Sequence, residues 1–180
     1  IWENATRYRI WDLNQWTDPS VIQPLTSDQV LLTRAGGLYY RALFPIYALT
    51  QSWPLDGQLF ALRVGSASFM LITVAATYGI ARTVFQSDTA RDRMIAWVAA
   101  ASVALQPMYA FISASLNDDN LVAPFTALAT LGVVRALRSE QSSRIGWSWW
   151  AVAVASAAGA VLTKRTGFAA VGVLVVGVLA

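Results

Sequence analysis

Five runs of apolar residues constrain this chain more than any other feature of its sequence. A helix that crosses a bilayer needs roughly 20 predominantly apolar residues. Such runs cover residues 64–81, 94–116, 121–137, 145–162 and 168–180, the last of them truncated. The connectors between them are short, so neighbouring spans must run antiparallel. The sequence therefore predicts an all-α membrane protein, built as an antiparallel bundle of transmembrane helices.

The composition excludes several classes of function. Hydrophobic residues make up 56% of the chain and charged residues 13%, whereas soluble domains average about 45–50% and about 25%. Histidine and cysteine are absent from the 180 residues. Their absence excludes a Ser-His-Asp triad, a cysteine nucleophile, a disulfide and a thiolate or imidazole zinc site within this stretch. The net charge of +3 is small and scattered, so we expect no nucleic-acid partner.

Residues 1–62 differ in kind from the apolar remainder. They carry four of the eight tryptophans and charges throughout, without a run long enough to span a membrane. Residues 38–49 are apolar and aromatic, which is typical of a helix that lies in the membrane interface. Ser27 or Asp28 is a suitable N-cap for another short helix. We therefore predict an extracytoplasmic loop with interfacial helices over residues 1–62, and a bundle of four spans plus a truncated fifth over residues 63–180.

The arginines predict the orientation of the bundle. Six of them lie in the connectors 82–93 and 135–144, whereas 117–120 has no basic residue and 163–167 has one lysine and one arginine. Cytoplasmic connectors of membrane proteins are enriched in Lys and Arg. We therefore expect the arginine-rich connectors to be cytoplasmic, and residues 1–62 to share the outer face with the other two connectors.

The polar stretch Asn117-Asp118-Asp119-Asn120 lies between the second and third spans. One interpretation is helix capping, by Asp119 or Asn120, of a helix that starts at Leu121. Capping needs only one such residue, however, and ionisable groups at membrane depth are costly. In a chain without His or Cys, these groups suit either a hard divalent cation such as Mg²⁺ or Mn²⁺, with Asp118 and Asp119 as ligands, or the hydroxyls of a sugar.

A second polar stretch, Thr163-Lys164-Arg165-Thr166, lies between the fourth and fifth spans, on the same predicted face. The two basic side chains either snorkel to lipid headgroups or bind a phosphate, for which Arg offers a bidentate fork and Lys a point charge. Their location on the face where the positive-inside rule disfavours them supports a phosphate site.

The aromatic residues Tyr39 and Tyr40 belong to a third candidate segment, residues 37–47. Aromatic side chains at this density either anchor a helix in the membrane interface or line an apolar groove for a lipid chain. The sequence leaves both interpretations open.

Three segments, taken in order, resemble one known family. Leu38-Tyr39-Tyr40, Pro45-Ile46-Tyr47 and Leu62-Arg63 are similar to the PPLYY…P-L-Y…L-R run of the polytopic GT-C glycosyltransferases. The stretch from Gln106-Pro107 to Leu121 resembles the P…F…S…N-N-D-N-L segment of their protein-mannosyltransferase and lipid A aminoarabinose-transferase branch. Leu162-Thr163-Lys164-Arg165-Thr166-Gly167 resembles its L-T-K-x-T-G segment, and the resemblance extends over residues 36–172.

The chain departs from the family pattern at three points. Gly36-Gly37 stands where the family has Pro-Pro, and Asp118 stands where Asn is commoner, so that Asp119 aligns with the family's Asp. The family's catalytic carboxylate lies in the first outer loop, which we expect upstream of Ile1. We therefore expect an internal fragment of a longer polytopic protein, and we assign the catalytic base to no residue of this chain.

The resemblance implies an inverting sugar transfer at the outer, extracytoplasmic face of the plasma (inner) membrane. The donor would be a polyprenyl-phosphate-linked sugar, and the acceptor a lipid, a glycan or a protein. Substrate-binding roles are then expected for Asn117, Asp118, Asp119, Asn120, Lys164, Arg165, Tyr39 and Tyr40.

Two other classes of protein stay open beside the glycosyltransferase. A transporter would place charged groups near the midplane, in broken or repeated spans, whereas the polar stretches here lie at span ends and no repeat is visible. A non-catalytic membrane scaffold would need no polar cluster at all.

Overall fold

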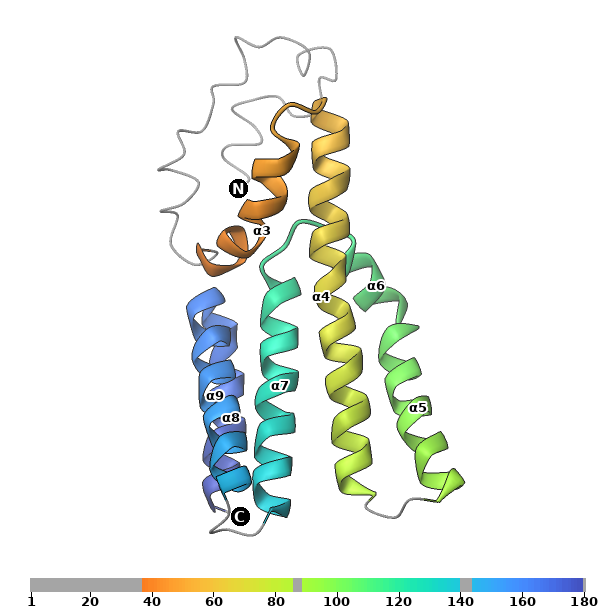
Figure 1. Ribbon diagram of the computed structural model, residues 1–180, viewed down its shortest axis with the longest axis vertical. Helices are drawn as coiled ribbons and strands as arrows, with labels where there is room; N and C mark the ends of the chain where they lie inside the picture. The colour runs from red at the N-terminus through yellow and green to blue at the C-terminus, as the bar shows by residue number, and fades with distance from the viewer. Residues whose placement is uncertain (1–36, 86–88, 140–143, 180) are drawn as a thin grey trace. The chain divides into compact units, whose positions relative to one another are not determined.

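The computed structural model describes residues 37–85, 89–139 and 144–179, and these residues form helices without any strand. The predicted N-cap at Ser27 or Asp28 lies outside the described residues. The helices, in chain order (Figure 1), are α3 (Gly37–Thr50), α4 (Leu55–Val84), α5 (Ala90–Ala104), α6 (Pro107–Ser113), α7 (Asp119–Arg138), α8 (Arg144–Thr163), the 3₁₀ turn η2 (Arg165–Gly167) and α9 (Phe168–Leu179). The prediction of an all-α helix bundle is confirmed.

Among the described residues, α4, α7 and α8 are each long and apolar enough to cross a membrane. They contain the predicted spans 64–81, 121–137 and 145–162. The pair α5 and α6 is a fourth candidate if its two parts count as one span, and η2 with α9 forms a shorter apolar helix. The chain is therefore a multi-pass membrane protein.

The predicted span 94–116 is not one straight helix. It consists of α5 and α6, whose axes differ by 59°, and it ends at Ser113. The break falls at Leu105 and Gln106, directly before Pro107, which occupies the first turn of α6. A proline ring clashes with helical backbone in the preceding turn and removes one N–H donor, so a helix begins readily at Pro107, whereas a helix that continued through it would lose a backbone hydrogen bond.

Helix α4 is longer than the predicted span at its N-terminal end. It begins at Leu55, nine residues before Val64, so residues 55–62 are helical although they were assigned to the outer loop. Its 30 residues correspond to about 45 Å at about 1.5 Å per residue, which exceeds the hydrocarbon thickness of about 30 Å. The predicted span began after Arg63 because the apolar run begins there. The helix itself continues beyond the hydrocarbon region, since polar side chains are tolerated where water surrounds them.

The long helices alternate in direction, as Figure 1 shows. One end of the bundle brings together α3, the 114–118 turn that precedes α7, and the connection from α8 to η2. The opposite end gathers the C-termini of α4 and α7 and the N-termini of α5 and α8. The two polar stretches singled out in the sequence therefore lie at the same end of the bundle.

Small residues allow the helix backbones to pack closely, which favours association between helices in lipid. A Cβ atom on Gly132 of α7 would lie 2.9 Å from the backbone nitrogen of Ala153 and 2.9 Å from the carbonyl oxygen of Trp149, both in α8. One core cluster consists of four buried alanines from α7, α8 and α9, namely Ala129, Ala157, Ala160 and Ala170.

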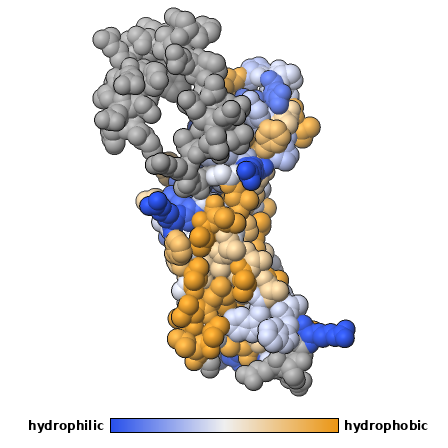
Figure 2. Space-filling model, turned by 90° about the vertical axis from the view of Figure 1, so that its left-hand side faces the viewer, coloured by the Kyte–Doolittle hydropathy of each residue, from blue (hydrophilic) through white to orange (hydrophobic). Residues whose placement is uncertain are grey.

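The outer surface of the bundle is apolar. Figure 2 shows a hydrophobic band over the face on the side of α8 and α9, with hydrophilic residues at both of its ends. Large apolar side chains are exposed on every long helix, including Leu71 of α4, Trp97 of α5 and Val176 of α9. Soluble monomers rarely expose such extensive apolar surface, whereas a lipid environment requires it.

Candidate functional site

An ion-pair cluster forms where the two polar stretches meet. The ammonium nitrogen of Lys164 lies 3.0 Å from Oδ1 of Asp118 and 2.9 Å from Oδ1 of Asp119. Lys164 donates a hydrogen bond to each of these carboxylates. The three residues, called here the Lys164 cluster, thus connect the start of α7 to the end of α8.

The backbone before α7 leaves both carboxylates available to Lys164. Helix α7 begins at Asp119, two residues earlier than predicted, and Asp118 makes no side-chain capping bond. Oδ1 of Asn117 instead accepts the hydrogen bond from the backbone N–H of Asp119, at 3.1 Å. The alternative interpretation, that Asp119 or Asn120 caps a helix starting at Leu121, is therefore wrong, because the helix starts at Asp119 and Asn117 supplies the oxygen that accepts from its first N–H.

The end of α8 presents Lys164 to the two carboxylates. The backbone of Lys164 is extended (φ −158°, ψ 151°), and the N–H of Lys164 donates to the carbonyl of Ala160 at 3.1 Å. The N–H of Gly167 donates back to the carbonyl of Lys164 at 2.9 Å. A Cβ atom on Gly167 would collide with the carbonyl group of Ala160, so this tight turn requires a glycine.

The Lys164 cluster is only partly shielded from solvent. The side chains of Lys164, Asp118 and Asp119 are 29%, 21% and 44% exposed. The hydrogen bond to Asp119 raises the pKa of Lys164 above its usual value, the interactions with Asp118 add to this effect, and desolvation partly opposes it. Two carboxylates and one ammonium leave the cluster with one negative charge at neutral pH.

In this structure Lys164 pairs with the two carboxylates that were the candidate ligands of a divalent cation. Within residues 37–85, 89–139 and 144–179, no three His, Cys, Asp or Glu side chains gather in a way that could hold a metal ion. We therefore assign no chemical step to a bound Mg²⁺ or Mn²⁺.

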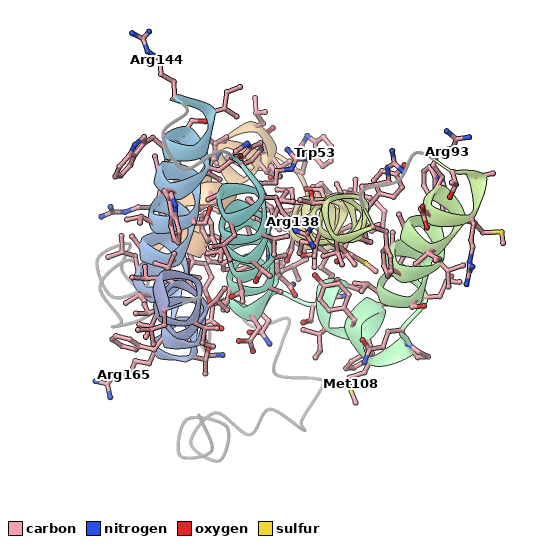
Figure 3. All side chains as sticks on the ribbon, turned by 90° about the horizontal axis from the view of Figure 1, so that it is seen from below. Trp53, Arg93, Met108, Arg138, Arg144 and Arg165 are labelled. Carbon is pink, nitrogen blue, oxygen red and sulfur yellow. The ribbon has the colours of Figure 1, made fainter. Side chains whose placement is uncertain are left out.

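The other predicted site residues lie outside the Lys164 cluster. Arg165 is exposed and extends away from the bundle (Figure 3). Tyr40 is exposed and packs edge-on against Tyr39, with ring centroids 5.2 Å apart and an interplanar angle of 71°. Tyr39 and Asn120 are buried, and both contact a residue that the sequence analysis did not select, Ser66 of α4.

Ser66 was missed because its sequence context indicates only close helix packing. It lies in Gly65-Ser66-Ala67-Ser68, a small-residue stretch inside an apolar run, and such stretches are typical of helix contacts in membranes. The one available signal was that a hydroxyl buried in a membrane span needs a polar partner. The sequence does not identify that partner.

The fold and the Lys164 cluster together define a class: a polytopic membrane protein with a charged site at one end of its helix bundle. Residues 42–180 match the family model of dolichyl-phosphate-mannose-protein mannosyltransferase, and the chain belongs to this family. No curated protein and no solved structure matches it significantly. The family consists of membrane glycosyltransferases of the GT-C type, so the resemblance noted in the sequence is confirmed.

Proposed function

We propose that the protein transfers a sugar from a polyprenyl-phosphate donor to a lipid, glycan or protein acceptor, with inversion at the anomeric carbon. The transfer takes place at the extracytoplasmic face of the plasma membrane. The family supports a membrane glycosyltransferase, and the observation that carries the finer proposal is the Lys164 cluster. It supplies a lysine held by two acids at the end of an apolar bundle, where the phosphate of a lipid donor would lie.

Lys164 is the proposed partner of the donor phosphate. An ammonium group has three N–H donors, and Asp118 and Asp119 account for two of them. The third is proposed to donate to a phosphate oxygen. Negative charge grows on that phosphate as the glycosidic bond breaks, so the interaction is stronger in the transition state than in the ground state, and such an interaction accelerates the reaction.

The two carboxylates are proposed to have different roles. Asp119 is the more exposed of the pair, which suits contact with a hydroxyl of the sugar or the acceptor. Asp118 is the more buried, which suits it to holding Lys164 in place. The base that deprotonates the acceptor is assigned to no residue of this chain; the family resemblance suggests an Asp of the family's first outer loop for that role.

Mass spectrometry tests the proposed reaction directly. Glycans and lipids of the outer face are compared between cells with and without the full-length gene, and the purified full-length protein is supplied with polyprenyl-phosphate sugars. The proposal predicts one glycosylated acceptor that disappears with the gene, together with release of polyprenyl phosphate in vitro. Transfer from a nucleotide sugar without any lipid-linked donor would contradict it.

A further inference from the structure

Ser66 of α4 is the centre of a buried hydrogen-bond network beside the Lys164 cluster. Its hydroxyl donates to the carbonyl of Ser115 at 3.1 Å. The same oxygen lies 2.7 Å from Nδ2 of Asn120 and 2.7 Å from the hydroxyl of Tyr39. A serine hydroxyl has one proton to donate and two lone pairs to accept with, so these three partners use its full capacity.

Asn120 closes the turn that carries the two acids. Its Nδ2 donates to the carbonyl of Ser115 at 2.7 Å and lies 3.3 Å from the carbonyl of Ser113. Asp118 and Asp119 lie within the segment 113–120, between these two ends. The amide can adopt only one orientation, because turning it over would place Oδ1 against carbonyl oxygens instead of Nδ2.

Tyr39 connects this network to α3. Its side chain is fully buried and packs with Leu43 and Leu121. Its hydroxyl donates to Ser66, because the proton of Ser66 is used by the carbonyl of Ser115. Burial raises the pKa of Tyr39 above its usual value. Helices α3, α4 and α7 and the turn before α7 are thus joined at one serine oxygen.

We propose that Ser66, Tyr39 and Asn120 form a positioning clasp that sets where Asp118 and Asp119 meet Lys164, an inference that rests on the proposed function. Removing one member leaves buried partners unsatisfied, which is costly in an apolar interior. The turn between Ser113 and Asn120 then shifts, and the carboxylates shift with it. A misplacement of about 1 Å at a reacting centre can lower a rate by about 100-fold.

The chain contains a matched control for this clasp. The hydroxyl of Tyr109 in α6 donates to Oγ1 of Thr73 in α4 at 2.7 Å. Thr73 follows Ser66 by seven residues, so it lies on nearly the same face of α4 about two turns away. This second tyrosine–hydroxyl pair also joins two helices, but it makes no hydrogen bond to the 113–120 segment among the described residues.

The experiment compares Ser66→Ala and Tyr39→Phe with Thr73→Val and Tyr109→Phe in the full-length protein in membranes. Two quantities are measured: sugar-transfer turnover, and the rate at which an amine-reactive reagent labels Lys164, the only lysine of the 180 residues, as located by peptide mass spectrometry. We expect both clasp variants to lose at least about tenfold in turnover. We also expect Lys164 to be labelled several-fold faster, while both controls behave as wild type.

Labelling separates the clasp from a general packing effect and from the proposed function. Lys164 labelled at the same rate in the clasp variants and in the controls would overturn the clasp, as would unchanged turnover in Tyr39→Phe and Ser66→Ala. If Ser66→Ala fails to fold, Tyr39→Phe decides, because it removes one oxygen atom only. If the wild type transfers no sugar but labelling still distinguishes the two pairs, the proposed function fails and the clasp stands.

Discussion

Lys164 gathers two carboxylates that precede it in the chain by 46 and 45 residues. A lysine suits this task because its compact ammonium donates in three directions, whereas the planar fork of an arginine donates along fixed ones. The residue types and their common face were predictable from the sequence. The contact between Lys164 and the two acids was not predictable, because it depends on how α7 and α8 pack. In the sequence the two polar stretches were interpreted as separate sites for separate ligands.

The first prediction concerns Asp119→Asn. The hydrogen bond to Asp119 is the largest cause of the raised pKa of Lys164, so its loss lowers that pKa and increases the neutral, reactive amine at any alkaline pH. Amine acylation of Lys164 should accelerate in Asp119→Asn more than in Asp118→Asn, and sugar transfer should fall strongly at unchanged expression. Equal and mild effects of the two substitutions would favour a purely structural role.

At the scale of elements, the order and direction of the helices follow from the lengths of the apolar runs and their short connectors. The break before Pro107 had a local signal, since proline disfavours an uninterrupted helix. Pro45 and Pro124, however, lie inside α3 and α7, so a proline in an apolar run does not by itself show whether the span is divided. The partners of Ser66 in the clasp had no local signal, because Asn120 is 54 residues distant in the sequence. Contacts of this range are fixed by tertiary packing.

The second prediction tests the close contact of α7 and α8. In Gly132→Ala the new methyl group meets backbone atoms of α8 at 2.9 Å, and backbone cannot rotate away as a side chain can. The variant should be destabilised by about 1–3 kcal/mol, measured as thermal unfolding of the full-length protein in detergent. Gly172→Ala in α9 is the control, since a Cβ there meets nothing within 4 Å. Equal stability of the two variants would contradict this packing.

At the scale of the whole molecule, the two ends of the bundle differ in charge. The end with the C-termini of α4 and α7 carries the arginine-rich connectors, and the other end carries the Lys164 cluster. Cytoplasmic connectors are enriched in basic residues, which predicts that the Lys164 cluster faces outward. The order of the spans alone showed at which end of the bundle each connector lies. Which end faces the cytoplasm is a prediction from the distribution of charge.

The third prediction tests this orientation by cysteine labelling. The 180 residues contain no native cysteine, and both Ser52 and Ala90 are exposed. An impermeant maleimide applied to intact cells should label Ser52→Cys, whereas Ala90→Cys should react only after the membrane is permeabilised. The opposite pattern would place the Lys164 cluster in the cytoplasm.

The central claim is that Lys164 stabilises the departing lipid phosphate, and the transfer rate of its variants tests it most directly. Rates are measured in membranes with equal amounts of full-length wild type, Lys164→Ala, Lys164→Arg and Arg165→Ala, using a polyprenyl-phosphate sugar. Losing one preorganised donor to a developing anion costs about 100- to 1,000-fold in rate, so Lys164→Ala should fall by that factor. Lys164→Arg should recover part of the loss, and Arg165→Ala, whose side chain extends away from the bundle (Figure 3), should remain close to wild type. The account would be contradicted if Lys164→Ala kept the wild-type transfer rate, whether Arg165→Ala lost its activity or also kept that rate.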